Sequence, residues 1–153
     1  MPFLKRRIAQ RMTPKWKGTS SPERTARNIS LYHRPGSVQT SVMVGQLGLK
    51  PTDPDWPAVE VANKILGGGP TGRLLMDLRE KHGWTYGAYS SFTKRRDTGY
   101  FAADANCRTE VTDSALTAML ANVDRIVNEP VTEDELNGAK SYLVGNFPTT
   151  IET

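Results

Sequence analysis

The chain of 153 residues contains one cysteine and two histidines, and this scarcity excludes several kinds of site. Cys107 alone cannot form an internal disulfide or a cysteine-based zinc finger. His33 and His82 belong to neither an H-E-x-x-H nor an H-x-x-E-H motif, and a catalytic zinc site usually needs three protein ligands. We therefore expect no metal ion and no cofactor bound by this chain itself.

Long apolar runs are also missing, since no stretch approaches the roughly 18 residues of a transmembrane helix. The start of the chain lacks the apolar core of a classical signal peptide. With 37% apolar and 24% charged residues, the composition is that of an ordinary globular chain long enough for one domain. We expect no transmembrane segment. The compartment stays open, with a bacterial cytoplasm or periplasm favoured over a mitochondrion.

Acidic residues are scarce in residues 1–27, which hold eight basic residues against the single acid Glu23. The net charge of this stretch is +7, which leaves −3 for residues 28–153, so a basic surface for nucleic acid is not indicated and we expect no nucleic-acid partner. We expect residues 1–24 to be a basic leader or inter-domain linker and residues 25–153 to be the domain. The leader fits a solvated linker, a mitochondrial presequence, or a segment that contacts acidic lipid or nucleic acid.

Four stretches of the body have the patterns of β-strands. Residues 28–34 alternate apolar and polar side chains, and Pro35-Gly36 then predicts a tight turn into a second strand over 38–49. These two runs should form a hairpin or neighbouring strands. Residues 84–92 and 100–106 flank a charged turn and predict a second hairpin. In the first strand of that hairpin, alternation places four side chains on one face: Tyr86, Ala88, Ser90 and Phe92.

Helices are predicted between and after these strand pairs. Asp55 can cap a first helix that ends at the glycines from Gly67 onward, and Thr71 can cap a second that ends at Gly83. A long amphipathic helix follows over 109–128. The last helix begins with a capping box and is bent or ended by a proline; the residues are Thr132, Glu135 and Pro148.

The order of these elements predicts the fold class. Two strand pairs, each followed by two helices, favour an α/β (α+β) two-layer sandwich, with a mostly antiparallel sheet and helices packed on one face. The chain stops shortly after a helix, so we expect the domain to be truncated, with a further strand missing.

Two other features, residues 67–72 and Cys107, are not expected to be functional sites. Residues 67–72 are glycine-rich and precede a helix, so they could cradle an anion. They lack the Gly-Lys-Ser/Thr ending of a phosphate loop and follow a helix rather than a strand, which favours a hinge between two helices. No G-x-S-x-G motif is present. Cys107 is expected to be a packed small side chain rather than a reactive thiol.

Residues 66–90 read LGGGPTGRLLMDLREKHGWTYGAYS. This stretch resembles the L-G-G-G-x-x-S-R-L…L-R-E-K-x-G-x-x-Y-x-V-x-S pattern of the second-half, zinc-free domain of pitrilysin/insulinase-family zinc metallopeptidases, a family that includes mitochondrial processing peptidase. Residues 34–39 and 131–153 agree with its strand-turn-strand start and its late helix pair, so the resemblance covers roughly 25–153. The departure is Gly72, where the family often has serine.

The resemblance implies a division of labour between two halves. In this family two homologous domains or subunits face each other as a clamshell, and one half carries H-x-x-E-H and the zinc ion. The other half is zinc-free and donates an arginine and a tyrosine seven residues apart. Arg79 and Tyr86 have this spacing. The implied partners of this chain are thus a homologous H-x-x-E-H domain or subunit, which holds the zinc, and a peptide substrate.

The implied chemistry suits these two side chains. A tyrosine hydroxyl can donate a hydrogen bond to the oxyanion of a tetrahedral intermediate or to a neighbouring peptide carbonyl. Arg79 can hold a carbonyl or keep Tyr86 polarised. On the residues alone, the favoured interpretation is that Tyr86 is an ordinary sheet aromatic and that Arg79 pairs with Glu80 or Asp77 on a solvated helix.

The sequence therefore leaves two candidate functions. The first is the zinc-free half of a clamshell metallopeptidase, which binds peptide and stabilises the intermediate but is inactive alone. The second is a catalytically inert scaffold subunit of a multi-protein complex, like the core subunits that this family contributes to respiratory complexes. The motifs do not support a hydrolase that works independently.

Overall fold

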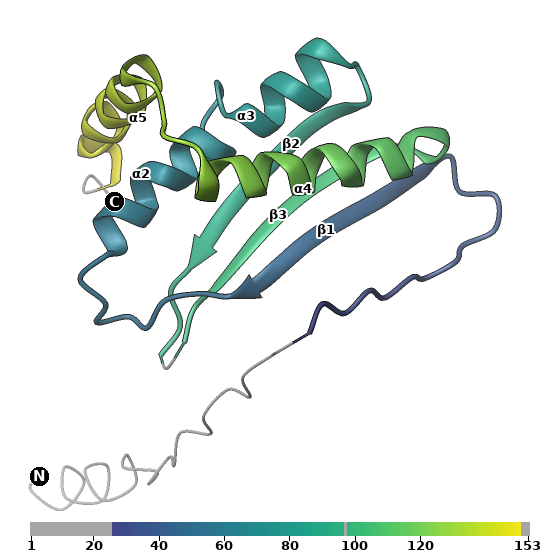
Figure 1. The fold of residues 1–153 in the computed structure, drawn as a ribbon, viewed down its shortest axis with the longest axis horizontal. Helices are drawn as coiled ribbons and strands as arrows, with labels where there is room; N and C mark the ends of the chain where they lie inside the picture. The colour runs from purple at the N-terminus through teal and green to yellow at the C-terminus, as the bar shows by residue number, and fades with distance from the viewer. Residues whose placement is uncertain (1–25, 97, 151–153) are drawn as a thin grey trace, which may run out of the picture.

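The computed structural model describes residues 26–96 and 98–150, which are built around a three-stranded antiparallel sheet. Its strands are β1 (Gln39–Leu47), β2 (Thr85–Thr93) and β3 (Tyr100–Arg108), in the order β1-β3-β2 (Figure 1). β2 and β3 form the predicted hairpin, whereas β1 reaches β3 only after a long connection through helices. The predicted leader, residues 1–24, lies outside the described residues.

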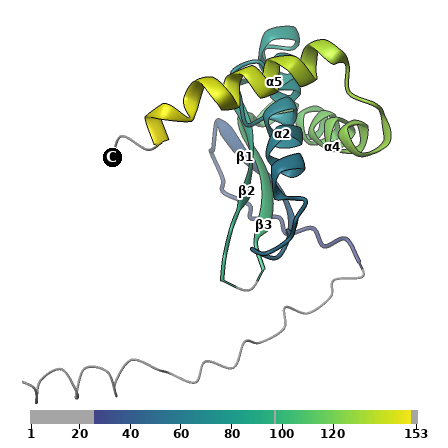
Figure 2. The same ribbon diagram turned by 90° about the vertical axis from the view of Figure 1, so that its left-hand side faces the viewer.

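Helices form the second layer. The elements are α2 (Trp56–Leu66), α3 (Arg73–Leu75), a π-helical turn η1 (Met76–Lys81), the 3-10 turn η2 (Thr109–Val111), α4 (Thr112–Asn128), α5 (Glu133–Asn146) and the 3-10 turn η3 (Pro148–Thr150). Seen along the sheet, α2 and α4 lie on the same side of the strands, and α5 packs against α2 (Figure 2). The predicted α+β two-layer sandwich with helices on one face is confirmed.

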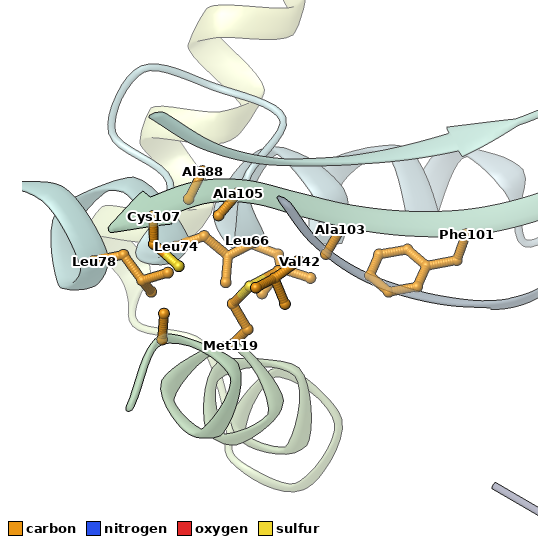
Figure 3. Close-up of a cluster of buried hydrophobic side chains, with 11 residues drawn as sticks. Val42, Leu66, Leu74, Leu78, Ala88, Phe101, Ala103, Ala105, Cys107 and Met119 are labelled. Atoms are coloured by element: carbon orange, nitrogen blue, oxygen red, sulfur yellow. The ribbon is translucent and has the colours of Figure 1, made fainter. Parts of the chain in front are cut away.

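The core lies between β3 and the helices. Alternate residues of β3 are buried and mostly small: Phe101, Ala103, Ala105 and Cys107. Larger side chains from the helices fill the space above them, among them Leu66, Leu74, Leu78 and Met119 (Figure 3). Small residues on the strand let the helices approach closely, and the Leu and Met side chains supply most of the apolar area removed from water. The burial of Cys107 confirms that it is a packed side chain.

The predicted strand over residues 28–34 is wrong. These residues form no strand and are exposed, so the first predicted hairpin does not exist. β1 instead pairs along its whole length with β3, from Gln39 opposite Arg108 to Leu47 opposite Tyr100. Alternation describes a strand only where a neighbour supplies hydrogen bonds, and here the long-range partner took precedence over the adjacent segment. The tight turn is confirmed, since the Ser37 amide donates to the Arg34 carbonyl at 3.3 Å.

The predicted cap at Thr71 is also wrong, by one residue. Gly72 is the N-cap of α3, and no side chain caps this helix end. Gly72 is buried so tightly that a Cβ atom there would lie 2.8 Å from the Cα of Gly67. The Gly67 carbonyl accepts a hydrogen bond from the Ser90 amide at 3.1 Å, which fastens the segment to β2. Residues 67–72 therefore form the predicted hinge between two helices, and their glycines permit close backbone packing.

The remaining helix boundaries agree with the sequence. Asp55 is the N-cap of α2, although its side chain makes no capping hydrogen bond. The capping box of α5 is complete: the Glu135 amide donates to Thr132 Oγ1 at 3.2 Å, and the Thr132 amide donates to Glu135 Oε2 at 2.9 Å. Within residues 26–96 and 98–150, no helix has the length and apolar character needed to cross a membrane.

Candidate functional site

A β-bulge at the start of β2 decides where Tyr86 lies. Thr85 pairs with Cys107, and the next pair in register joins Ala88 to Ala105, so β2 has one residue more than β3 in this interval. Both Thr85 and Ala88 are buried, whereas Tyr86 is 87% exposed. The prediction that Tyr86 shares a face with Ala88 is therefore wrong, because a bulge interrupts the alternation of side chains.

Hydrogen bonds to Thr85 hold the bulge in place. The Thr85 hydroxyl oxygen lies 2.6 Å from the carbonyl oxygen of Asn106 on β3. It also accepts a hydrogen bond from the Gly87 amide at 3.1 Å. Because Thr85 is buried, this network fixes the path of the backbone on both sides of Tyr86.

Next to the bulge, the sheet face that the helices leave uncovered has a shallow pocket of about 360 Å³. We call it the open-face pocket. It is lined by residues of all three strands: Gln39, Thr85, Tyr86, Gly87, Tyr89, Asp104 and Asn106. Tyr89 lies directly opposite Asp104 in the β2–β3 pair. The pocket thus combines two phenol rings, two amide side chains and one carboxylate.

The ring of Tyr89 lies against the backbone at Gly87. A Cβ atom on Gly87 would be 2.7 Å from Cε2 of Tyr89 and 2.8 Å from its hydroxyl oxygen. Any larger residue at position 87 would push this ring away. The glycine is therefore part of the construction of the pocket, because it leaves room for the aromatic side chain.

Arg79 lies outside the open-face pocket. It belongs to η1, its side chain is half-exposed, and its Nε is 3.4 Å from Oε1 of Glu80. Among the described residues, no hydrogen bond or ion pair joins its side chain to Tyr86. The link between the two positions is the backbone: the Gly83 amide donates to the Arg79 carbonyl at 2.9 Å, and the chain then turns into β2.

Four residues of the pocket were not singled out from the sequence: Gln39, Tyr89, Asp104 and Asn106. Two signals point to them in retrospect. A glycine inside a strand, here Gly87, is a common sign of a bulge that re-aims its neighbours. In β3 the residues that alternate with the buried alanines include Asp104 and Asn106, which the pleat directs to the other face.

The described residues do not fit a zinc site. In that part of the chain, no three histidine, cysteine, aspartate or glutamate side chains lie together as metal ligands would. His82 is engaged elsewhere: its ring stacks on Trp84 with centroids 4.1 Å apart, and its Nε2 is 3.5 Å from Oδ1 of Asp77. His33 lies in the exposed segment before β1. The donor set for a catalytic zinc ion is missing from this region.

Comparison with known families shows which family the chain belongs to. The family model described as the peptidase M16 inactive domain matches residues 4–143. The chain therefore belongs to the peptidase M16 inactive-domain family. M16 is the family of zinc metallopeptidases that the sequence resembles, so this resemblance is confirmed.

Relatives of this M16 inactive domain include proteases and solved structures of the same domain. An uncharacterized zinc protease of Streptomyces coelicolor is 33% identical over 129 residues, which cover 84% of this chain and 28% of that protein. The crystal structure of a peptidase M16 inactive domain from Pseudomonas fluorescens is 40% identical, with a TM-score of 0.69 over 71% of this chain and 27% of that one.

A protease from Helicobacter pylori shares the fold of this M16 domain. Its TM-score is 0.73 at 20% identity, and the match covers 81% of this chain and 30% of the other. The M16 domain described here thus spans less than a third of each of these three proteins.

Proposed function

We propose that this chain is the zinc-free half of a two-part peptidase, whose open sheet face contacts the peptide during cleavage. Zinc would be held entirely by an H-x-x-E-H half, in the same polypeptide or in a second subunit. Membership of the inactive-domain family supports this division, as does the lack of a ligand cluster in residues 26–96 and 98–150. The observation that carries the proposal is an exposed tyrosine, Tyr86, at the edge of a pocket lined by polar groups.

Tyr86 would donate a hydrogen bond to the peptide. The bulge turns its side chain out of the core, and the Thr85 network holds the backbone that carries it. A donor whose backbone is already in place needs less rearrangement when negative charge develops on the peptide carbonyl oxygen. Its hydroxyl would hydrogen bond to this oxygen in the tetrahedral intermediate more strongly than in the bound substrate.

Arg79 would bind a carbonyl of the same peptide. Its contact with Glu80 is long and exposed, and an ion pair of this kind contributes little energy. The guanidinium can therefore leave Glu80 when a peptide is present. Its five N–H donors suit the carbonyl oxygens of an extended backbone.

The test is peptide cleavage by this chain together with an H-x-x-E-H half. Tyr86→Phe keeps the ring and removes only the donor. We expect kcat/KM to fall by about tenfold to a hundredfold, mostly through kcat, because the hydrogen bond strengthens in the transition state. Tyr32→Phe is the matched control, since Tyr32 is 90% exposed and lies in the segment before β1. It should leave cleavage unchanged.

Arg79→Ala has an equally close control in Arg125→Ala. The two side chains are 50% and 51% exposed, and each lies beside a glutamate. We expect Arg79→Ala to lower kcat/KM by roughly tenfold and Arg125→Ala to have no effect. Unchanged cleavage in both Tyr86→Phe and Arg79→Ala would reject the auxiliary catalytic role. An inert scaffold subunit, the alternative function, predicts no cleavage with any partner and a stable complex with other proteins.

A further inference from the structure

The open-face pocket contains a single carboxylate, that of Asp104. We infer that this pocket is a subsite for a basic side chain, lysine or arginine, of the bound peptide. This inference rests on the proposed function, because it names the class of substrate that the same surface would take.

Asp104 lies in the middle of the sheet. It belongs to the central strand and is flanked by Met43 on β1 and by Tyr89 on β2. Its side chain is partly buried, and among the described residues no lysine, arginine or histidine forms an ion pair with it. A carboxylate that is partly desolvated and unpaired favours an incoming cation more than a fully solvated one would.

The neighbours of Asp104 also suit a cation. Tyr86 and Tyr89 are both exposed at the pocket, and the face of a phenol ring attracts ammonium and guanidinium groups. Gln39 and Asn106 add amide oxygens that can accept hydrogen bonds from the same group. The volume of about 360 Å³ lies near the lower end of the range for ligand pockets, which suits one long side chain rather than a whole ligand.

The basic side chains that the described residues place on this face of the sheet lie away from the pocket. Arg95 lies over the ring of Tyr100, 5.7 Å from its centroid, and Tyr100 is four positions from Asp104 along β3. Arg108 is exposed at the end of β3, opposite Gln39, and it is not among the residues that line the pocket. It is four positions from Asp104, which is about 13 Å along a strand. At physiological ionic strength charges this far apart are largely screened. The charge at the pocket is therefore that of Asp104.

Binding of short peptides to the 153-residue chain tests the inference without any need for cleavage. We would use fluorescent decapeptides of alanine and serine with one lysine, arginine, norleucine or glutamate at each position in turn, and measure Kd by anisotropy. Norleucine matches the length of lysine without its charge. We expect the best lysine and arginine peptides to bind about fivefold more tightly than their norleucine counterparts, and the glutamate peptides to bind most weakly.

Variants then assign the preference to Asp104. Asp104→Asn should remove the difference between lysine and norleucine, and Asp104→Lys should favour glutamate. The control is Asp113→Asn, because Asp113 is an exposed acid in the first turn of α4, on the other layer of the domain. It should keep the wild-type preference. Circular dichroism of each variant would show that the fold is retained.

Several results would overturn the inference. These are equal affinity for lysine and norleucine peptides, no binding of any peptide, or a preference that persists in Asp104→Asn. Weaker association of Asp104→Asn with the H-x-x-E-H half, with no peptide preference, would mean that Asp104 serves the contact between halves instead. Cleavage that depends on Tyr86 without a preference for basic peptides would reject only this inference. Basic peptides that bind selectively but are never cleaved would reject only the proposed function.

Discussion

Arg73 and Glu135, 62 positions apart in the sequence, form a bidentate ion pair. Nε of Arg73 lies 2.6 Å from Oε1 of Glu135, and Nη2 lies 2.8 Å from Oε2. The side chain of Arg73 is only 10% exposed. The same glutamate completes the capping box with Thr132. One carboxylate therefore joins the start of α3 to the start of α5, and holds the last helix against the rest of the domain.

Acid should weaken this junction. The hydrogen bond from Arg73 is the main cause that lowers the pKa of Glu135 from 4.5 to about 2. A carboxyl group whose pKa is lower in the folded state stabilises the fold above its unfolded pKa. This contribution, roughly 2 kcal/mol, should be complete above pH 4.5 and disappear as the pH falls toward 2. Urea unfolding at pH 7, 4 and 2.5 would measure it.

Glu135→Gln is the control for this pH dependence. Glutamine at this position can still complete the capping box but cannot carry the charge. At pH 7 the variant should be less stable than the wild type by roughly 3 kcal/mol, because the buried Arg73 loses its counter-ion. The difference in the free energy of unfolding between the wild type and Glu135→Gln should become smaller as the pH falls. A constant difference down to pH 2.5 would show that Glu135 does not stabilise the fold through its charge.

Thr132→Ala should remove the side-chain cap of α5. The Glu135 amide would lose its acceptor, and we expect the free energy of unfolding to fall by about 1 kcal/mol. Thr117→Ala, at an exposed position within α4, should leave stability unchanged or raise it slightly. Chemical denaturation of both variants would measure the effect. Equal stabilities would mean that the capping box contributes nothing measurable.

Gly87→Ala should disturb the open-face pocket. The new methyl group would occupy the space of the Tyr89 ring, so we expect the ring to move and the affinity for basic peptides to fall by about threefold. Gly138→Ala is the control, since a Cβ atom at this helical position meets nothing within 4 Å and should stabilise α5 by about 0.5–1 kcal/mol. The position of Tyr89 can be followed by NMR. An unmoved ring would contradict the close packing at Gly87.

Cys107 should be protected from thiol reagents in the folded protein. It is 1% exposed and lies in the core beside Met119 and Ala105. Reaction with an aromatic disulfide reagent should therefore follow unfolding, and become rapid in concentrated urea. The rate in native buffer, compared with the rate in urea, checks this. A fast reaction in native buffer would mean that the sheet and helices separate readily near Cys107.

Local chemistry predicted most of the elements. The capping box at Thr132, the turn at Pro35-Gly36 and the glycines after Leu66 each act over a few residues, so their effect can be read from neighbouring positions. The hairpin of β2 and β3 is local as well, because its strands are joined by a short turn. Such signals need no knowledge of the rest of the fold.

The errors that concern the sheet depend on distant contacts. Residues 28–34 have the pattern of a strand, but β1 pairs with β3, and none of the described strands pairs with residues 28–34. The face on which Tyr86 lies depends on a register shift against Cys107 and Ala105. Asp104 became a candidate only when the sheet placed it opposite Tyr89. A glycine in the strand, such as Gly87, indicates that a bulge can occur, but the register and the partner residues are set only by the folded sheet.

Patterns along the chain were enough to predict the class of the domain, most helix boundaries, the family resemblance, and the spacing of Arg79 and Tyr86. The tertiary structure decided which strand pairs with which, which face of the sheet stays open, and which side chains meet in its pocket. The physical reason is the range of the interactions. Caps and turns are formed by neighbours in the chain, whereas strand pairing and a bulge depend on a partner brought close by folding of the whole domain.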